Sequence, residues 1–369
     1  MSGSISEIAI IGAGNGGCAA AADLTLRGFS VRLYGRSAAA LAPIRERGGI
    51  EMTGVLGERF APVTMITHDA GEAIRGADLI VLMGPTHAHG ELADLVAPHI
   101  TDDQILLAAP GHTVLLIPNA LRARGRSVRA YCDTATLPYI ARKSGPATVR
   151  ITQAARYLIF ASFPGDRTAE LAERIRAVYP SIQPSQNLLE TVFPYTNAIH
   201  HPPAILCNAG RVEATGGDYY HYYDGISPAV GRLIDALDRE RLAIAEALGV
   251  RALPFVEQFY RNGYTTQAAR DTGLAFEAFH QSEPDRWIRA PSSLDHRFLN
   301  EDVPFGLVLL SELGRLAKVA TATIDHMIHL ASAAIGKDFR AHGLTLERLG
   351  LGEHDPASAI ALLNHGYVN

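Results

Sequence analysis

Cysteine is scarce in this chain, which has three among its 369 residues. Cys18, Cys132 and Cys207 lie far apart in the sequence, and no two of them form a Cys-x-x-Cys pair. Disulfide frameworks and thiolate metal sites need more cysteines, or cysteines at close spacing. The composition therefore excludes both. It is typical of a reducing compartment, and we expect a cytoplasmic protein.

The sequence also lacks long apolar runs and an excess of positive charge. No apolar stretch reaches the roughly 20 residues that cross a bilayer, and we see no basic leader with a cleavage site. Lys and Arg number 33 against 38 Asp and Glu, for a net charge of -5 and a pI near 6.3. Nucleic acids and anionic membranes usually require a basic face. We expect small-molecule partners, with neither nucleic acid nor membrane among them.

Length and composition fit a globular protein of two domains. A chain of 369 residues, 47% of them hydrophobic and 19% charged, is too long for one compact core. The composition changes at Pro180–Asn187, a polar segment with two prolines that cannot continue a helix. We therefore expect one domain over 1–183 and a second over 184–369.

The strongest motif of the first domain is a glycine-rich turn between an apolar run and an alanine-rich, helix-like segment. These three parts are Ile8–Ile11, Gly12-Ala13-Gly14-Asn15-Gly16-Gly17 and Cys18–Leu26. Gly12 permits a tight turn, Gly14 lets the backbone approach a pyrophosphate, and Gly17 lets the helix pack close to the strand. Such turns are common, but the strand before this one and the helix after it favour a dinucleotide site, with Asn15 also at the cofactor.

An acidic residue is missing where NAD-specific folds of this kind place one. After the expected second strand, Ser30–Tyr34, no Asp or Glu occurs before Ala42. NAD-specific folds use such a residue to bind a ribose hydroxyl of the adenosine. Arg36 stands there instead, and the fork of a guanidinium suits a 2′-phosphate. The sequence favours NADP(H), and NAD(H) stays the alternative if Arg36 only stacks on adenine or points to solvent.

Short apolar runs predict the rest of a parallel sheet, and helical periodicity begins after Asn187. We expect strands within 76–83, 104–108 and 128–132, a hairpin over Gly48–Thr67, and an antiparallel pair of Val149–Gln153 with Tyr157–Ala161. In the second domain, helices are expected over 228–248, over 306–335 with a break near Lys318, and over 356–363. The predicted fold class is α/β, an N-terminal Rossmann domain followed by an all-α substrate domain without strands.

The loops after these strands should line the ligand crevice, as in other doubly wound sheets. Gly84–Gly90 should border the nicotinamide end of the cofactor, with Pro85 in contact with it. His87 and His89 in this loop resemble a ligand pair, but no third ligand is nearby. We therefore expect no metal, and a histidine that touches cofactor or substrate. The loop after 128–132 contains Thr136, a candidate for substrate binding.

Two histidines open the helical domain, in Asn197-Ala198-Ile199-His200-His201-Pro202-Pro203. Reduction by a nicotinamide needs a group that exchanges a proton with the substrate, and histidine titrates near neutral pH. The prolines fix the backbone beside both imidazoles. Either histidine is a candidate for this role. The alternative is a histidine at a helix start whose ring is satisfied by backbone groups.

A second constellation joins a cation to an acidic pair ahead of a helix. Arg297 precedes Glu301 and Asp302, and Pro304 and Gly306 follow them. An arginine can bind a substrate carboxylate, and an acid can orient an imidazole. The alternative is helix capping, in which both acids complement the dipole of the helix that begins near Gly306. Capping and catalysis can both hold.

With these motifs the chain resembles the octopine/nopaline (opine) dehydrogenase family over nearly its whole length. The matching segments are Gly12–Gly17, Leu137-Pro138-Tyr139, Asn197…His201-Pro202 and Arg297…Glu301-Asp302-Val303-Pro304…Gly306. The resemblance implies a Rossmann domain with a helical substrate domain. It also implies NAD(P)H-dependent reductive condensation of an amino acid with a 2-oxo acid, which yields an N-(carboxyalkyl) amino acid.

The same resemblance assigns roles to individual residues. His201 matches the proton-transfer histidine of the family, Asp302 its acidic partner and Arg297 its substrate-carboxylate arginine, and His200 is an additional histidine. Asn197, in the same motif, is expected at the substrate. In the implied reaction Arg297 holds a carboxylate of the imine between the domains, while His201 exchanges a proton as hydride reaches the imine carbon.

Two other functions stay open at this point. One is a 2-oxo or 2-hydroxy acid reductase, ketopantoate reductase-like or glycerol-3-phosphate-dehydrogenase-like, although such enzymes generally centre on a lysine. The other is a non-catalytic NAD(P)H sensor, which has no evident use for a His201–Asp302 pair. The tyrosines at 219, 220, 222 and 223 would line a substrate pocket or a subunit interface. A homodimer is the expected assembly, by association with similar helical domains.

Overall fold

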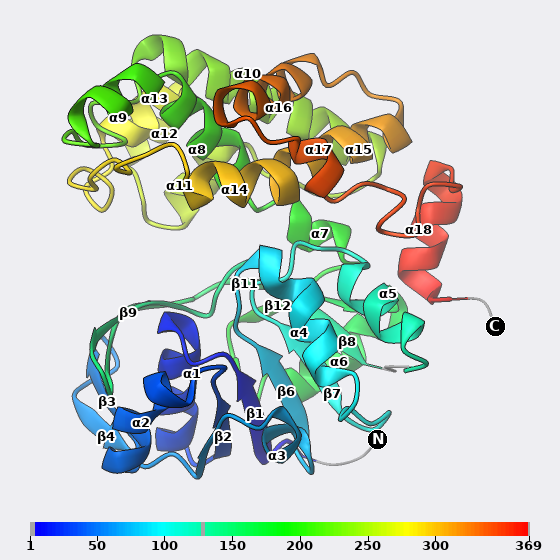
Figure 1. The fold of residues 1–369 in the computed structure, drawn as a ribbon. Coiled ribbons are helices and arrows are strands. Elements are labelled where there is room, and N and C mark those ends of the chain that lie inside the picture. The colour runs from blue at the N-terminus through cyan, green and yellow to red at the C-terminus, as the bar shows by residue number, and fades with distance from the viewer. Residues whose placement is uncertain (1–3, 127–129, 368–369) are drawn as a thin grey trace. The chain divides into compact units, whose positions relative to one another are not determined.

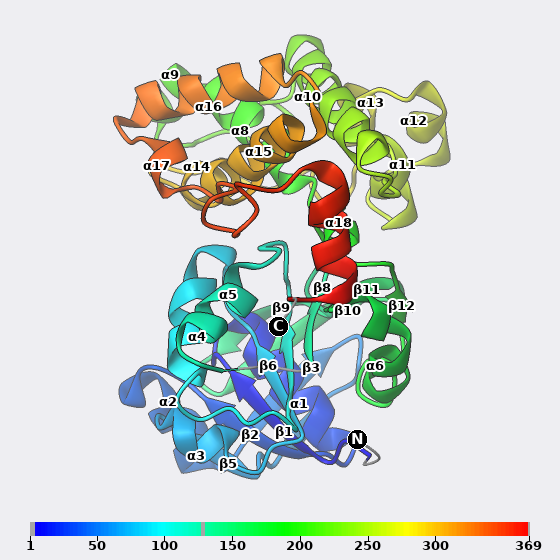
Figure 2. The same cartoon turned by 90° about the vertical axis from the view of Figure 1, so that its right-hand side faces the viewer.

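The computed structural model describes residues 4–126 and 130–367, which form two compact units (Figures 1 and 2). The first unit comprises Met1–Val192 together with Ala361–Asn369, and the second comprises Phe193–Ile360. The break after Val192 comes later than the predicted break after 183. The last residues belong to the first unit, so the predicted second domain over 184–369 is not one body.

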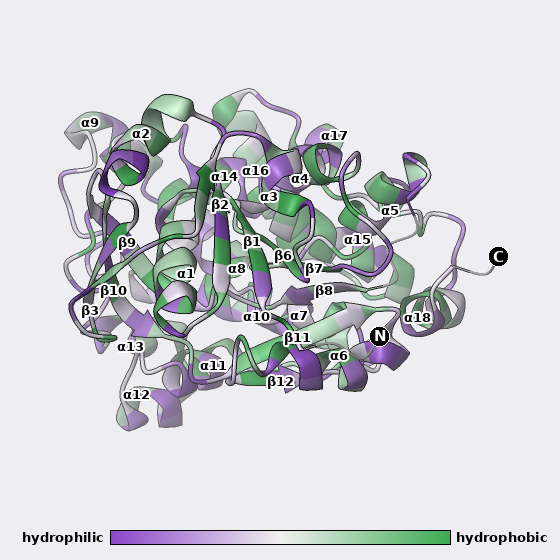
Figure 3. Cartoon of the chain, turned by 90° about the horizontal axis from the view of Figure 1, so that it is seen from below, coloured by the Kyte–Doolittle hydropathy of each residue, from purple (hydrophilic) through white to green (hydrophobic). Residues whose placement is uncertain are grey.

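The first unit is built on an eight-stranded sheet with the order β12-β11-β8-β7-β6-β1-β2-β5. Its strands are β1 (Glu7–Ile11), β2 (Ser30–Tyr34), β5 (Met65–Thr67), β6 (Leu79–Leu82), β7 (Ile105–Ala108), β8 (Tyr131–Thr134), β11 (Leu158–Phe163) and β12 (Ile182–Pro184). All neighbours pair in parallel except β8 with β11. The central strands are buried and strongly hydrophobic (Figure 3), which explains their almost continuous apolar runs.

The order of this sheet reverses between β1 and β6, and that point is where doubly wound sheets bind nucleotides. Helical segments follow or connect the strands of this unit. They are α1 (Asn15–Leu26), α2 (Ala38–Arg47), α3 (Ala70–Ile74), η1 (Thr86–Ala88), α4 (His89–Val96), α5 (Leu116–Ala123), η2 (Gly165–Arg167), α6 (Thr168–Ile175) and α7 (Leu189–Val192). The predicted Rossmann architecture is confirmed.

A second, four-stranded sheet with the order β4-β3-β10-β9 lies over helix α1. Its strands are β3 (Ile50–Gly54), β4 (Arg59–Ala61), β9 (Tyr139–Gly145) and β10 (Thr148–Ala154). Helix α1 contacts all four of them as well as β1 and β2 (Figure 1). Ala19–Ala22 are therefore fully buried, because alanine is small enough for a helix packed between two sheets.

The pairing of this second sheet differs from the sequence prediction. The expected antiparallel pair of Val149–Gln153 and Tyr157–Ala161 is wrong, because β10 pairs with β9 and β3 while β11 pairs with β8 and β12. The hairpin over Gly48–Thr67 holds for β3 and β4, but β5 joins the main sheet. Strand β8 begins at Tyr131, and the first two residues of the predicted strand 128–132 lie outside the described residues.

The second unit is helical. Its elements are α8 (Asn197–Leu206), α9 (Ala209–Thr215), α10 (Pro228–Ala247), α11 (Phe255–Arg261), α12 (Gln267–Thr272), α13 (Ala275–His280), α14 (Arg297–Asn300), the π-helical turn η3 (Val303–Leu307), α15 (Val308–Ala317), α16 (Ala322–Ile335) and α17 (Phe339–His342). All of 193–360 is described, and it contains no strand but one isolated bridge between Tyr220 and Arg289. Lys318, in the left-handed conformation at φ 58°, ends α15 at the predicted break.

The last helix, α18 (Pro356–His365), leads the chain back to the first unit. There the Asn187 side-chain amide donates to Asn364 Oδ1 at 2.8 Å. The Tyr367 ring packs edge-on against Phe163 and lies under the Arg122 guanidinium. These contacts explain why the C-terminus does not belong to the helical unit. No helix among the described residues has the length and apolar character to cross a membrane.

Candidate active site

The glycine-rich turn of the first unit has a geometry that only glycine permits at two positions. Gly12 has φ +124°, and a Cβ there would lie 2.4 Å from the Met83 carbonyl oxygen. A Cβ on Gly17 would lie 1.6 Å from the Gly12 carbonyl oxygen. A Cβ on Gly14 would meet no described atom within 4 Å, and no described side chain caps α1. The residues present therefore fit a pyrophosphate at this helix N-terminus.

The side chain of Asn15 makes a contact within the protein that the sequence did not indicate. Its Oδ1 accepts from the Lys143 backbone N–H at 2.8 Å, which ties β9 to the start of α1. Leu137 lies over Gly16, and the Tyr139 hydroxyl donates to Asp23 Oδ2 at 2.7 Å. The segment from Leu137 to Lys143 thus clamps the helix that carries the glycine-rich turn.

The other expected cofactor and substrate residues of the first unit lie in loops after strands. Arg36 is exposed directly after β2, beside Ser37, whose hydroxyl accepts from the Ala40 N–H and caps α2. Pro85 and Thr136 are exposed after β6 and β8. The described residues contain no cluster of three or more His, Cys, Asp or Glu side chains that could hold a metal ion.

The pair of loop histidines separates in the structure. His87 is exposed, whereas His89 is fully buried, with Nδ1 3.0 Å from the Thr113 hydroxyl. Burial lowers the pKa of His89 to about 3, so this ring stays neutral at physiological pH. His89 is a core residue of the loop cluster rather than a surface ligand.

A buried carboxyl group lies beneath the next loop of the first unit. Asp133 is fully buried in β8, and a Cβ on Gly111 would lie 2.2 Å from its Oδ2. Burial raises the pKa of Asp133 to about 8. His112, in the same loop at φ 71°, has its pKa lowered by burial to about 4. The floor of this loop is therefore uncharged near neutral pH.

In the second unit, four side chains form one hydrogen-bonded chain, in which three are buried and Tyr195 is half-buried. His201 Nδ1 lies 2.6 Å from Asp302 Oδ2, and His201 Nε2 lies 2.8 Å from the Tyr222 hydroxyl. The Tyr195 hydroxyl donates to the other carboxylate oxygen, Asp302 Oδ1. The structure thus brings His201 and Asp302 together, although 101 positions separate them in the sequence. We call Tyr195, Asp302, His201 and Tyr222 the acid–base chain.

Unusual local backbone brings His201 and Asp302 together. His201 lies in α8, directly before Pro202 and Pro203, which remove two backbone donors from this helix. Asp302 is the N-cap of the π-helical turn η3, a form that often marks functional sites. A Cβ on Gly306 in η3 would lie 2.3 Å from the Ala198 Cβ in α8. The absence of that atom lets the two elements approach.

Burial controls the protonation of this pair. His201 is 6% exposed and Asp302 is fully buried. Burial raises the pKa of Asp302 to about 7, and the Tyr195 hydrogen bond opposes that rise. Burial lowers the pKa of His201 well below its ordinary value, with a further contribution from the positive charge of Arg297. An ionised Asp302 can only accept, so the proton shared with His201 lies on Nδ1 and Nε2 carries none.

The remaining residues of the two motifs divide their tasks. Arg297 is 58% exposed and forms an ion pair at 2.9 Å with Glu301, which is buried. Glu301 therefore positions the Arg297 side chain, and Asp302 hydrogen-bonds the His201 ring. Asn197 is the first residue of α8, half-buried and one helical turn before His201. His200 packs among Phe255 and Phe279 in an apolar cluster, outside the acid–base chain.

Sequence reasoning missed both tyrosines of the acid–base chain. Tyr222 lies in the tyrosine cluster noted above, which splits into buried Tyr219 and Tyr222 and half-buried Tyr220 and Tyr223. Its spacing from His201 gave no signal of contact. Tyr195 is an isolated tyrosine ahead of α8, and no pattern in the sequence distinguishes it.

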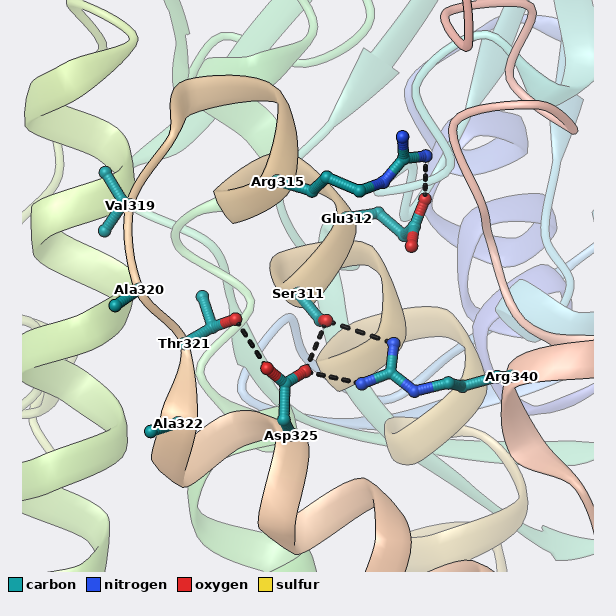
Figure 4. Close-up of a pocket in the computed structure, with 9 residues that line it drawn as sticks. All are labelled: Ser311, Glu312, Arg315, Val319, Ala320, Thr321, Ala322, Asp325 and Arg340. Atoms are coloured by element: carbon teal, nitrogen blue, oxygen red, sulfur yellow. Dashed lines mark hydrogen bonds and ion pairs between the residues drawn. The ribbon is translucent and has the colours of Figure 1, made fainter.

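A separate cavity of about 480 Å³ in the second unit has no part in this site. Ser311, Arg315, Asp325 and Arg340 line it, and Figure 4 shows Ser311, Asp325 and Arg340 joined to one another, with Arg315 joined to Glu312. Asp325 accepts from the Ser311 and Thr321 hydroxyls and from Arg340, while Arg315 pairs with Glu312. The charges are thus matched within the protein, and the network connects α15, α16 and α17.

Replacement of Gly306 by alanine tests the close approach of η3 and α8. The added methyl group has to displace Ala198, which we expect to destabilise the second unit by about 1–3 kcal/mol, the usual cost of overpacking. Calorimetric unfolding measures the change. Gly210→Ala is the matched control, because a Cβ there meets no described atom within 4 Å. Equal stability of the two variants would contradict the importance of this approach.

The buried Asp133 predicts a pH dependence of stability. Its folded pKa of about 8 lies above the ordinary 3.8, so the stability it contributes is complete below about pH 4 and is lost as the pH rises toward 8. In Asp133→Asn the side chain cannot ionise. We therefore expect the unfolding temperature of this variant to fall less than that of the wild type between pH 5 and pH 8. Parallel pH profiles would contradict the raised pKa.

Comparison with family models identifies both units. The model for the NAD/NADP octopine/nopaline dehydrogenase alpha-helical domain matches residues 184–335. The model for the N-terminus of NAD-dependent glycerol-3-phosphate dehydrogenase matches residues 7–110, within the Rossmann fold.

Known proteins resemble the chain over nearly its full length. An opine dehydrogenase from Arthrobacter sp. (strain 1C) is 35% identical over 93% of this chain and 94% of its own. An octopine dehydrogenase structure with NADH and agmatine has a TM-score of 0.79 at 19% identity and 99% coverage of both chains. A yersinopine dehydrogenase with bound NADP+ has a TM-score of 0.75 at 15% identity, again with 99% of each chain covered. The chain belongs to the opine dehydrogenase family of NAD(P)-dependent oxidoreductases.

Proposed function

We propose that this enzyme condenses the amine of an amino acid with a 2-oxo acid and reduces the product with NADPH, with His201 and Asp302 as its acid–base pair. The observation that carries the proposal is the buried contact of 2.6 Å between His201 Nδ1 and Asp302 Oδ2. A carboxylate in that position fixes the tautomer of the ring and stabilises the imidazolium that forms.

Condensation needs a base first and an acid afterwards, and His201 fits both steps. An amino acid enters as an ammonium ion, whose proton passes to Nε2 so that the free amine attacks the carbonyl carbon. Proton transfer within the adduct gives a carbinolamine. The imidazolium then returns its proton to the departing hydroxyl group, which yields water and an iminium ion. The depressed pKa of His201 suits this cycle, because the ring starts neutral.

Arg297 is the residue we assign to a substrate carboxylate. Its guanidinium is more than half exposed, and its Nη2 pairs with Glu301 at 2.9 Å. The exposed part of this fork suits a carboxylate. Asn197 and Thr136 are proposed as further substrate contacts on the same motifs and loops. Orientation of the iminium by several contacts determines which face is reduced.

The proposed substrate classes agree with what structures of related proteins hold. Octopine dehydrogenase has been solved with NADH and L-arginine, and also with NADH and pyruvate. Those compounds are an amino acid and a 2-oxo acid. A ketopantoate reductase also shares the fold, with a TM-score of 0.62 at 18% identity, but this likeness concerns the fold alone.

We propose that the cofactor is held at the glycine-rich turn of the first unit. Gly12, Gly14 and Gly17 with the Asn15 backbone form the pyrophosphate cradle, and Pro85 borders the nicotinamide end. When bound, the nicotinamide supplies the hydride that reduces the iminium carbon. The exposed Arg36 beside the start of α2, without a neighbouring acid, favours NADPH over NADH. Relatives include both an NADH complex and an NADP+ complex.

A matrix of amino acids against 2-oxo acids tests the function. We expect NADPH to be consumed only when both substrates are present, with a secondary amine as product. His201→Ala should lower the rate by roughly 10²–10⁴-fold, the usual worth of a positioned acid–base group. His200→Phe is the control, since it keeps the ring contacts of that cluster. Consumption of NADPH with the 2-oxo acid alone, at an undiminished rate, would indicate a simple 2-oxo acid reductase instead.

Arg36→Ala tests the cofactor preference. Loss of charge-assisted hydrogen bonds to a 2′-phosphate should lower kcat/KM for NADPH roughly 10- to 100-fold. The value for NADH should stay within about twofold, because NADH lacks that phosphate. Arg150→Ala, at an exposed arginine on β10, is the matched control for the loss of a surface charge. A parallel fall with both cofactors would refute a phosphate-specific role.

A further inference from the structure

We propose that Tyr222 is a catalytic residue whose hydroxyl meets the reacting amine and relays protons between it and His201 Nε2. This inference rests on the proposed function above and deepens it. In that mechanism His201 exchanges protons with substrate. In the structure, however, the ring nitrogen that would face the substrate, Nε2, is hydrogen-bonded to the Tyr222 phenol.

Both nitrogens of His201 already have partners within the protein. Nδ1 faces Asp302 at 2.6 Å, and Nε2 faces the Tyr222 hydroxyl at 2.8 Å. With the shared proton on Nδ1, Nε2 accepts a hydrogen bond from the Tyr222 O–H. No ring nitrogen is therefore open to a ligand while this chain is intact, and a proton reaches Nε2 through the phenol.

Neither ring is placed to turn away easily. The His201 ring stacks on Phe298 with 3.8 Å between centroids and meets His200 edge-on at 4.4 Å. The Tyr222 ring stacks on Phe279 at 5.1 Å with an interplanar angle of 2°. Both residues are 6% exposed, so bulk water does not compete for the contact between them. The geometry is preorganised for proton transfer between the phenol and the imidazole.

A phenol is chemically suited to this position. While its O–H donates to Nε2, its oxygen still has a lone pair that accepts an N–H of the substrate ammonium. In the first transfer the ammonium N–H bond breaks as a new phenol O–H bond forms, and the original O–H proton moves to Nε2. The reverse movement delivers a proton to the departing hydroxyl group. Each transfer conserves protons and leaves Tyr222 neutral, so a phenolate is never required.

The surroundings of Tyr222 also indicate where a polar ligand binds. His221 is fully buried, and neither of its ring nitrogens has a hydrogen-bond partner among the described residues. Its ring lies 4.7 Å from that of Tyr222 and 6.5 Å from that of His201. Buried polar groups without a hydrogen-bond partner destabilise the folded protein. A substrate that hydrogen-bonds His221 beside the Tyr222 hydroxyl would remove that destabilisation.

The backbone holds this segment in place around the proposed site. The His221 N–H donates to the Ile288 carbonyl at 2.8 Å, and the Ala290 N–H donates to the Tyr219 carbonyl at 3.0 Å. A Cβ on Gly225 would lie 2.2 Å from the His221 carbonyl oxygen. The positions of His221 and Tyr222 are thus fixed from both sides, as a relay needs.

Tyr222→Phe removes the hydroxyl and keeps the ring that stacks on Phe279. We expect kcat to fall roughly 10- to 100-fold, with KM for NADPH unchanged. In single-turnover reactions, the proton inventory of the wild type should be curved, because two protons move in one step, and that of the variant should be linear. Tyr219→Phe is the matched control, since the Tyr219 hydroxyl is buried and has no hydrogen-bond partner in the described part of the chain.

The possible outcomes distinguish a failure of this inference from a failure of the proposed function. Full activity of His201→Ala would overturn both. Loss of activity in His201→Ala together with an unchanged kcat and inventory in Tyr222→Phe would overturn the relay alone, and Tyr222 would then only hold the ring. If Tyr222→Phe unfolds well below the wild type, the wild-type inventory decides, because a linear inventory excludes two protons in flight.

Discussion

The hydrogen bond between His201 Nδ1 and Asp302 is the interaction on which the site of the second unit depends, and it forms in a place from which water is excluded. A carboxylate is costly to bury unless donors satisfy it. Here the imidazole and the Tyr195 hydroxyl do so, one on each oxygen. The same burial keeps the imidazole neutral, because a charged ring would lose its hydration. Stability and reactivity of this pair therefore have one physical cause.

In each unit, a glycine lets two elements approach closely because it has no side chain. In the first, Gly17 lets α1 lie against the turn at Gly12, and in the second, Gly306 lets η3 lie against Ala198 of α8. In each case a single Cβ would overlap with atoms of the neighbouring element. Surrounding residues then hold the approach: β9 reaches α1 through Asn15, and Pro202 and Pro203 stiffen α8. Glycine in these motifs is thus a packing requirement as much as a conformational one.

How much of the structure could be predicted from the sequence depended on how close together in the chain the interacting residues lie. The turn at Gly12–Gly17 carries its own strand and helix, so periodicity and glycine spacing were sufficient. The His201–Asp302 contact came from motif resemblance, since spacing alone does not join residues 101 positions apart. The parallel pairing of β10 with β3 and the return of the C-terminus to the first unit were not predictable, because their partners are remote and leave no periodic pattern. Tyr195 and Tyr222 were missed for the same reason.

Nearly all hydrogen-bonding groups of the acid–base chain have partners within the protein. Few of them are therefore left to distinguish one substrate from another. Asp302 has a donor on each oxygen, and His201 has a partner on each nitrogen. Hydrogen-bonding capacity remains on the second lone pair of Tyr222, on both nitrogens of His221 and on the exposed face of Arg297. A site built to pair such groups rejects analogues that leave them unpaired. Differences in substrate between members of this family are therefore expected at His221, at Arg297 and at their neighbours, while His201 and Asp302 can stay constant.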